Sequence, residues 1–256
     1  DAYIYAIQVL KECEGIISLV DKANIMTPGA SRINNFSTEM LGSFYVNDLY
    51  TTSGNLFGMG GRTASTTTGI LIDGNRYEAL KRFVYDRQPD GDAGLDTRFD
   101  VWFQSSSEYS NYDFTKFLEP AKRQGLGNAY YPEIPIMRLS EIYYIACEAQ
   151  IGKDNALALQ YLNDVRDNRN LSLIQTVPDD ATLLEYLVRE MRKDFIGDGR
   201  TFLMHKRLFY DIYTVRGETV PASDNIFVIP IPDDEYEFSG IEKPGNTTDN
   251  NQSELL

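Results

Sequence analysis

The fold of this chain is decided at residues 139–165, which read LSEIYYIACEAQIGKDNALALQYLNDV. Apolar residues recur at three- and four-residue steps on both sides of a short break at residues 151–154, and this spacing predicts two amphipathic helices. Because the break is so short, the two helices must lie side by side and antiparallel. The small side chains of Ala146, Ala149 and Ala158 would let the backbones approach closely. The stretch therefore predicts a helical hairpin of the tetratricopeptide kind.

Three further helices are predicted around this hairpin. Residues 1–22 carry apolar side chains at helical spacing. Asp179 and Asp180 can cap a helix with a wide apolar stripe, and the glycine-containing break at residues 197–199 allows a shorter helix over residues 202–209. The last two helices would form a second hairpin.

Residues 24–130 have a different composition, with short apolar bursts separated by Gly, Ser, Thr and Asn. This pattern predicts a loop-rich insert with a few short strands, for example at residues 43–46, and a helix near residues 77–85. Residues 240–256 are polar and predict a mobile tail. The predicted fold is mostly α, an α/α superhelix of stacked hairpins that supports the insert.

The composition is that of a globular protein with enough apolar residues for a core, since 42% of the 256 residues are hydrophobic. The formal net charge of −14 opposes binding to nucleic acid and to anionic lipids, because both depend on Lys and Arg. No segment approaches the ~20 apolar residues that cross a bilayer. Nucleic acid is therefore set aside as a partner.

The cysteines and the histidine offer little catalytic chemistry. Cys13 and Cys147 match no zinc or redox spacing, and buried free thiols are favoured over a disulfide. His205 is the only histidine, and no Gly-x-Ser-x-Gly turn accompanies it. An ordinary helical position is the favoured interpretation of His205.

Several charged residues could be taken for a catalytic carboxylate set, of the kind that glycosidases hold across a bond. They are Arg138 with Glu141, and Glu190 and Asp194 with Arg207. With 38 acidic residues such pairs arise by chance, and neighbouring Arg residues can neutralise them. Structural ion pairs are the favoured interpretation.

The acidic segment at residues 86–96 has the Asp-Gly-Asp centre of a calcium loop. An EF-hand also needs a bidentate Glu at its twelfth position, where this chain has Thr97. A solvated turn is favoured, so no metal or other cofactor is expected.

The insert contains a candidate carbohydrate site. Sugars bind to flat aromatic faces, and amide, carboxylate or Arg groups form hydrogen bonds with their hydroxyls. The candidates are Trp102, Tyr109 and Tyr112 for stacking and Arg98 and Asn111 for polar contacts, with Tyr50, Asn47 and Asn55 as a looser second group. Core packing is the alternative for each aromatic residue.

Three blocks in the second half resemble the carboxy-terminal signature of the SusD/RagB-like family, nutrient-binding lipoproteins of the outer membrane of Bacteroidetes. The first block has Pro135, Arg138, Leu139, Glu141, Tyr143, Glu148 and Ala149, followed by Leu162, Asn163 and Arg166 in the partner helix. The second has Glu190, Arg192 one place late, Asp194, Phe195, Asp198, Gly199, Phe202 and Arg207. The third has Ile229, Pro230, Ile231, Pro232 and Glu235.

The chain departs from the family pattern at Thr201, which replaces an Arg, and at Met204, which replaces an Asp. The Asn-Pro that commonly follows the third block is absent, and the segment at residues 95–99 looks like the family's Asp-x-Arg segment. Family members are usually about twice as long and start with a lipidated Cys and two earlier hairpins. By this resemblance, residues 1–23 belong to a preceding hairpin, residues 131–239 form the carboxy-terminal hairpins and the Pro-Ile-Pro segment, and the chain is expected to be a fragment.

The resemblance implies a cell-surface protein, lipid-anchored in the full-length form, that captures a nutrient and delivers it to a SusC-like TonB-dependent transporter without a chemical step. An oligosaccharide is the expected ligand. Some relatives take peptides, which a surface of charge −14 would suit. A polysaccharide hydrolase and a plain tetratricopeptide scaffold for protein partners remain as alternatives from other classes.

Overall fold

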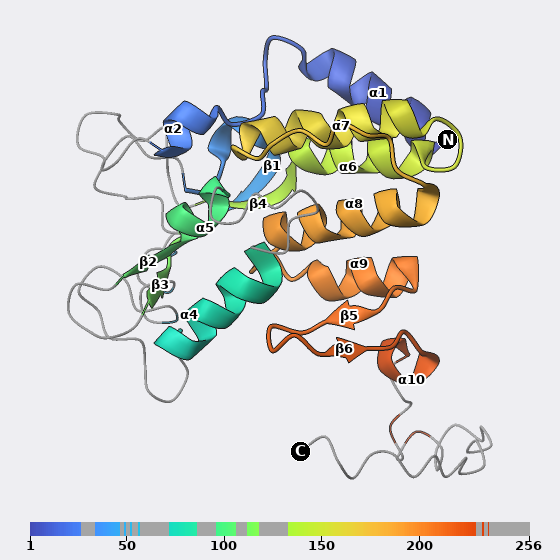
Figure 1. Cartoon of the computed structure of the whole chain (residues 1–256). Helices are drawn as coiled ribbons and strands as arrows, with labels where there is room; N and C mark the ends of the chain where they lie inside the picture. The colour runs from blue at the N-terminus through green and yellow to red at the C-terminus, as the bar shows by residue number, and fades with distance from the viewer. Residues whose placement is uncertain are drawn as a thin grey trace, which may run out of the picture.

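A computed structural model of this chain describes residues 1–26, 34–46, 49, 52, 56, 72–85, 96–105, 112–117, 133–228, 232 and 235. The predicted mostly α fold is confirmed. The helices of the carboxy-terminal half lie one beneath another, and the short elements of the insert lie together at one end of this stack (Figure 1).

The helical hairpin predicted at residues 139–165 is present as α6 (Leu139–Gln150) and α7 (Asn155–Asn168). Gly152 takes a left-handed conformation in the turn, with φ of 76°, which glycine adopts at little cost. The Asp154 carboxylate then caps α7 by accepting the Leu157 N–H at 3.0 Å. Local sequence thus fixes both the end of α6 and the start of α7.

The second predicted hairpin is also present, as α8 (Asp180–Asp194) and α9 (Thr201–Leu208). The Asp179 side chain caps α8. Beyond α9 the chain forms a small hairpin, β5 (Ile212–Tyr213) with β6 (Thr219–Val220), and the short helix α10 (Asp224–Phe227). Residues 229–231 and 240–256, which hold most of the Pro-Ile-Pro segment and the expected tail, lie outside the described residues.

The helix predicted over residues 1–22 is shorter than expected. α1 (Ala2–Cys13) ends before Gly15, which takes a left-handed φ of 75°, and the short helix α2 (Lys22–Met26) follows. The prediction was wrong beyond Cys13, because a residue with positive φ cannot continue a right-handed helix. α1 packs against α6, through Ala6, Ile142 and Ala146.

The described part of the insert is built from short elements, as predicted. After the 3-10 turn η1 (Ser37–Glu39), β1 (Met40–Tyr45) pairs antiparallel with β4 (Glu133–Arg138), which leads directly into α6. The helix predicted near residues 77–85 is present as α4 (Gly74–Leu80), continued by the π-helical turn η2 (Lys81–Tyr85). α5 (Thr97–Trp102) leads into β2 (Phe103–Ser105), which pairs with β3 (Tyr112–Phe114).

Besides the small cluster between α1 and α6, the described residues form two larger hydrophobic cores. One lies between α6, α7 and α8, and includes Leu162, Leu187 and Phe195. The other lies within the insert and is rich in aromatic rings, including Phe36, Phe99, Trp102, Phe103 and Phe114. Among the described residues, none of the helices has the length and apolar character needed to span a bilayer.

Candidate functional site

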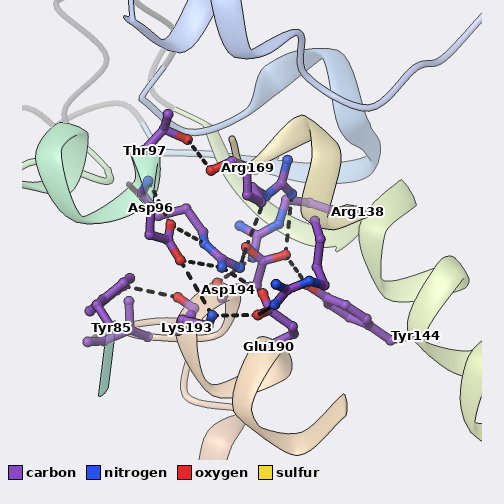
Figure 2. A network of polar contacts seen from close by, with 12 residues as sticks. Tyr85, Asp96, Thr97, Arg138, Tyr144, Arg169, Glu190, Lys193 and Asp194 are labelled. Carbon is purple, nitrogen blue, oxygen red and sulfur yellow. Dashed lines mark hydrogen bonds and ion pairs between the residues drawn. The ribbon is translucent and has the colours of Figure 1, made fainter. Parts of the chain in front are cut away.

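A buried network of charged side chains joins the insert to the helical stack (Figure 2). Arg98 of α5 is fully buried and donates to Asp96 at 2.6 Å, to Glu190 at 2.7 Å and to Asp194 at 2.9 Å. Arg169 binds both oxygens of Glu39, at 2.7 and 3.0 Å. Each of these carboxylates therefore faces at least one guanidinium group.

The ionisation of the network follows from these contacts. Burial by itself would raise the pKa of Asp194, but Arg169, Arg98 and Arg138 outweigh this effect and hold the pKa well below its usual range. The same balance, with Lys193 as the strongest counter-charge, lowers the pKa of Glu190 to about 2. These carboxylates are ionised near neutral pH, buried from solvent and paired with cationic side chains, and this arrangement favours a structural role for the network.

Arg98 was predicted to contact ligand, and that prediction was wrong. Its side chain has 0% exposure, and its guanidinium group donates to the carboxylates of Asp96, Glu190 and Asp194. The carboxylates of α8 that bind it lie more than 90 residues further along the chain.

Trp102 was also predicted to contact ligand, and it too is fully buried. Its indole N–H donates to the Asn34 carbonyl at 2.7 Å. One ring face lies near the Lys116 ammonium, 4.6 Å from the centroid, and the Phe36 ring packs at 5.0 Å. These contacts leave no ring surface for a sugar, so the alternative of core packing is correct for Trp102.

Tyr112 is partly exposed and remains a candidate. Its ring stacks on Tyr77 with 3.6 Å between centroids, and its backbone N–H donates to the Ile72 carbonyl at 2.8 Å. One ring face is therefore covered. The other predicted ligand contacts, Tyr50, Tyr109 and Asn111 together with Asn47 and Asn55, lie outside the described residues.

A hollow of about 820 Å³ opens between α4, the β2–β3 ladder and the turn of the β5–β6 hairpin. Its floor is mostly apolar, and its rim is polar. The floor includes Ile72, Leu80, Phe83, Phe103, Phe114 and Ile196, and the exposed rim has Asp73, Asn75, Arg76 and Arg216 together with Val215. Tyr112 lies next to this hollow, because its neighbour Ile72 and the residue two places on, Phe114, both line it.

At two places on the hollow, the backbone of a glycine packs directly against an aromatic ring that lines it. Gly217 has φ of 84°, and a Cβ atom there would lie 2.5 Å from Cε1 of Phe83. Gly197 has φ of 78°, and its Cβ would lie 2.8 Å from Cε1 of Phe114. Only glycine allows both the conformation and the close approach, so these walls are defined by sequence.

The turn that carries Arg216 is fixed by Thr214. The Thr214 carbonyl accepts the Gly217 N–H at 3.1 Å, and its hydroxyl accepts the N–H groups of Arg216 and Glu218, each at 3.2 Å. On the opposite rim, the Asp73 carboxylate caps α4 at the Arg76 N–H, at 2.8 Å. Both rims are thus preorganised, and they present guanidinium groups at the mouth of an apolar hollow.

No arrangement for covalent chemistry occurs among the described residues at this hollow or in the network. His205 is buried in α9, with Nδ1 3.3 Å from the Tyr210 carbonyl. The charged residues singled out by sequence do form ion pairs, but with other partners. Arg138 pairs with Asp198, Glu141 with Arg200, and Arg207 with Glu148.

The described residues include no group of three or more His, Cys, Asp or Glu that could hold a metal ion. Most of the acidic segment at residues 86–96 lies outside the described part of the chain. Its last member, Asp96, uses both carboxylate oxygens on Arg98. Cys13 and Cys147 are free and buried, as predicted.

Sequence reasoning missed the residues of the hollow, including Phe83, Phe103, Phe114 and Arg216. One signal was available. Residues 212–220 read as two β-prone pairs separated by five residues that contain Gly217, which is typical of a β-hairpin. Its packing against Phe83, more than a hundred residues earlier, leaves no local signal.

The SusD family model (SusD_RagB) matches residues 101–252, more than half of the chain. Solved structures of SusD superfamily proteins share the fold. One from Bacteroides thetaiotaomicron VPI-5482 has a TM-score of 0.60 at 18% identity, over 93% of this chain and 54% of that one. A SusD-like carbohydrate binding protein from Bacteroides vulgatus ATCC 8482 has a TM-score of 0.60 at 16% identity, over 96% of this chain and 56% of that one.

A third SusD superfamily protein, from Parabacteroides distasonis ATCC 8503, has a TM-score of 0.56 at 13% identity, over 86% of this chain and 48% of that one. The chain thus spans about half the length of these structural relatives. None of the curated proteins matches the sequence.

Proposed function

Because the chain belongs to the SusD family, we propose that it is part of a cell-surface binding protein that captures an oligosaccharide and passes it to a SusC-like TonB-dependent transporter. In the full-length protein a lipid anchor would hold it at the outer membrane. One of its structural relatives is described as a carbohydrate binding protein. Capture and transfer need no chemical step.

The observation that carries the proposal is the preformed hollow beside Tyr112. Its walls are fixed by glycine–aromatic contacts, and an apolar floor is combined with a charged rim. Ligand sites in proteins are concave and mostly apolar, with a few polar groups that set orientation. Rigid walls favour affinity, because little conformational entropy is lost when a ligand binds.

The experiment is a screen of oligosaccharides and oligopeptides against the full-length protein, followed by calorimetry on each ligand found. We expect an oligosaccharide to bind, and Tyr112→Ala to weaken its binding at least tenfold, since stacking of the sugar on the tyrosine ring is lost. Tyr5→Ala is the matched control, because Tyr5 is 67% exposed on α1, away from the hollow. Binding of peptides alone, or unchanged affinity of the Tyr112 variant, would contradict the proposal or its site.

Transfer to a transporter is tested separately. The full-length protein, isolated from native outer membranes under mild detergent, should bring a TonB-dependent transporter with it. If glycans bind but no such transporter is recovered in stoichiometric amount, the delivery step is wrong while capture stands.

A further inference from the structure

The floor of the hollow is poorly suited to an unsubstituted sugar ring. A pyranose carries hydroxyl groups around its whole edge, and each one buried without a partner costs free energy comparable to a lost hydrogen bond. The side chains of Ile72, Leu80, Phe83, Phe103 and Phe114 offer no donors or acceptors. A sugar could bind at the polar rim of this hollow. The apolar floor, in contrast, is suited to an apolar group.

The aromatic content of the floor favours a flat ring as that group. Phe103 and Phe114 both line the hollow, with their ring centroids 5.3 Å apart and the rings tilted by 38°, so the floor includes a tilted pair of aromatic rings. Aromatic pairs prefer offset or edge-to-face arrangements at such distances, and an incoming ring could extend the pair in the same way.

The rim supplies donors where such a ligand would have acceptors. Arg216 and Arg76 line the mouth, and a guanidinium group carries five N–H donors and no acceptor. The carbonyl oxygen of an ester between an aromatic acid and a sugar hydroxyl is an acceptor of matching character. A ligand with an aromatic ring in the floor and ester oxygens at the rim would satisfy both parts of the hollow.

We propose that this hollow binds the aromatic acyl group of an ester-decorated glycan. The inference rests on the proposed glycan-binding function and adds the chemical class of the substituent. The sugar chain then lies along the polar rim beside Tyr112, the ester oxygens lie at the rim, and the aromatic ring of the acyl group occupies the apolar floor.

The experiment compares one oligosaccharide in two forms. Feruloylated arabinoxylan oligosaccharides are titrated against the full-length protein by calorimetry, and the same preparation is titrated after mild alkaline saponification, which removes the ester and leaves the sugar unchanged. Methyl ferulate, an acetylated xylo-oligosaccharide and a phenylalanine-rich peptide are the further probes. We expect the feruloylated form to bind at least tenfold more tightly than the saponified form, and methyl ferulate to compete with it.

Two variants locate the binding in this hollow. Ala79→Trp places a large side chain on the lining of the hollow, and Glu78→Trp is its control, since Glu78 is the exposed neighbour on α4 that does not line it. Val215→Lys is a second variant, at a lining position that is 44% exposed and therefore tolerant of change. We expect Ala79→Trp and Val215→Lys to remove the advantage of the feruloylated form, while Glu78→Trp keeps it.

The outcomes separate this inference from the proposed function. Equal affinity for the feruloylated and saponified forms overturns the inference and leaves glycan capture standing. An advantage that survives both lining variants also overturns it, because the ester then binds elsewhere. Preference for the acetylated sugar or for the peptide overturns the aromatic ester as ligand class. If no glycan binds in either form, both proposals fail.

Discussion

The guanidinium group of Arg98 lies 2.7 Å from the carboxylate of Glu190, with both side chains buried, and this contact joins α5 of the insert to α8 of the helical stack. Asp96 and Asp194 bind the same guanidinium group. Arg98 is thus one of the residues whose buried ion pairs join the insert to the helical stack.

We expect Arg98→Ala to lower the free energy of unfolding by about 3–5 kcal/mol, because three carboxylates lose a buried partner. The control is Lys22→Ala, which removes an exposed ion pair with Asp167 and should cost no more than about 1 kcal/mol. Urea unfolding followed by circular dichroism measures both. Equal losses in the two variants would show that the network is not important for stability.

The ionisation of Glu190 predicts a loss of stability in acid. Burial alone would raise its pKa, but Lys193, Arg98 and Arg166 lower it to about 2, below the 4.5 of an ordinary Glu. A carboxylate whose pKa is lowered by folding stabilises the protein above its unfolded pKa, and this contribution is lost as the pH falls from 4.5 toward 2. The amount is on the order of 3 kcal/mol.

The comparison of wild type with Glu190→Gln isolates this contribution. The difference in unfolding free energy should be largest above about pH 5 and should shrink steadily below pH 4.5. A difference that stays constant from pH 7 to pH 3 would mean that Glu190 has the same pKa in the folded and unfolded states.

The helices and the candidate site differ in how far sequence could predict them. The α6–α7 hairpin depends on apolar spacing, Gly152 and the Asp154 cap, all of which lie within about thirty residues of one another. Such local features are visible in a single sequence. The family blocks identified in the second half lie within the matched region at residues 101–252, apart from local departures such as Thr201.

Arg98 and Trp102 could not be placed in the same way. Their segment is polar and aromatic, which is the composition of a sugar-binding loop as well as of a buried junction. The decision depends on Glu190 and Asn34, which lie 92 and 68 residues away, respectively. The pairing of distant residues leaves no local pattern, and a single sequence therefore favours neither interpretation.

The lowered pKa of Lys116 predicts that the free energy of unfolding rises with pH in mild alkali. Its ammonium group donates to the carbonyls of Asp194 and Ile196 and to the Asp198 carboxylate, but burial and the nearby Arg138 lower its pKa from 10.5 to about 7. Between those values the unfolded chain binds more protons than the folded protein, so the free energy of unfolding rises with pH. The slope should approach about 1.4 kcal/mol per pH unit.

Lys116→Met removes this proton and should remove the slope. Unfolding free energies of wild type and variant are measured between pH 6 and 9.5, a range in which tyrosine ionisation contributes little. A wild-type curve that runs parallel to that of Lys116→Met would show that Lys116 keeps its ordinary pKa in the folded protein.

The two thiols should be unreactive in the folded protein. Burial raises the pKa of the Cys147 thiol to about 12, with a smaller effect from Glu148, and it also raises the pKa of Cys13. Since the thiolate is the nucleophile, iodoacetamide at pH 8 should modify Cys147 only after denaturation. Mass spectrometry of tryptic peptides gives the extent at each site, and rapid modification of Cys147 in native buffer would contradict its burial.

Gly217 should be needed for the shape of the hollow as well as for the turn. In Gly217→Ala the new methyl group would meet the Phe83 ring at 2.5 Å, in addition to the strain of φ at 84°. Gly15→Ala is a matched control for the strain alone, because Gly15 has φ of 75° and no atom within 4 Å of the added Cβ.

Each variant should lose about 1 kcal/mol of stability from the left-handed conformation, and Gly217→Ala should lose more, because the hairpin must move off Phe83. Glycan affinity should fall in Gly217→Ala and remain unchanged in Gly15→Ala, since only the former displaces Arg216 and Val215 from the rim. Thermal unfolding and calorimetry measure the two effects, and equal behaviour of the two variants in both assays would show that contact with Phe83 does not position this wall.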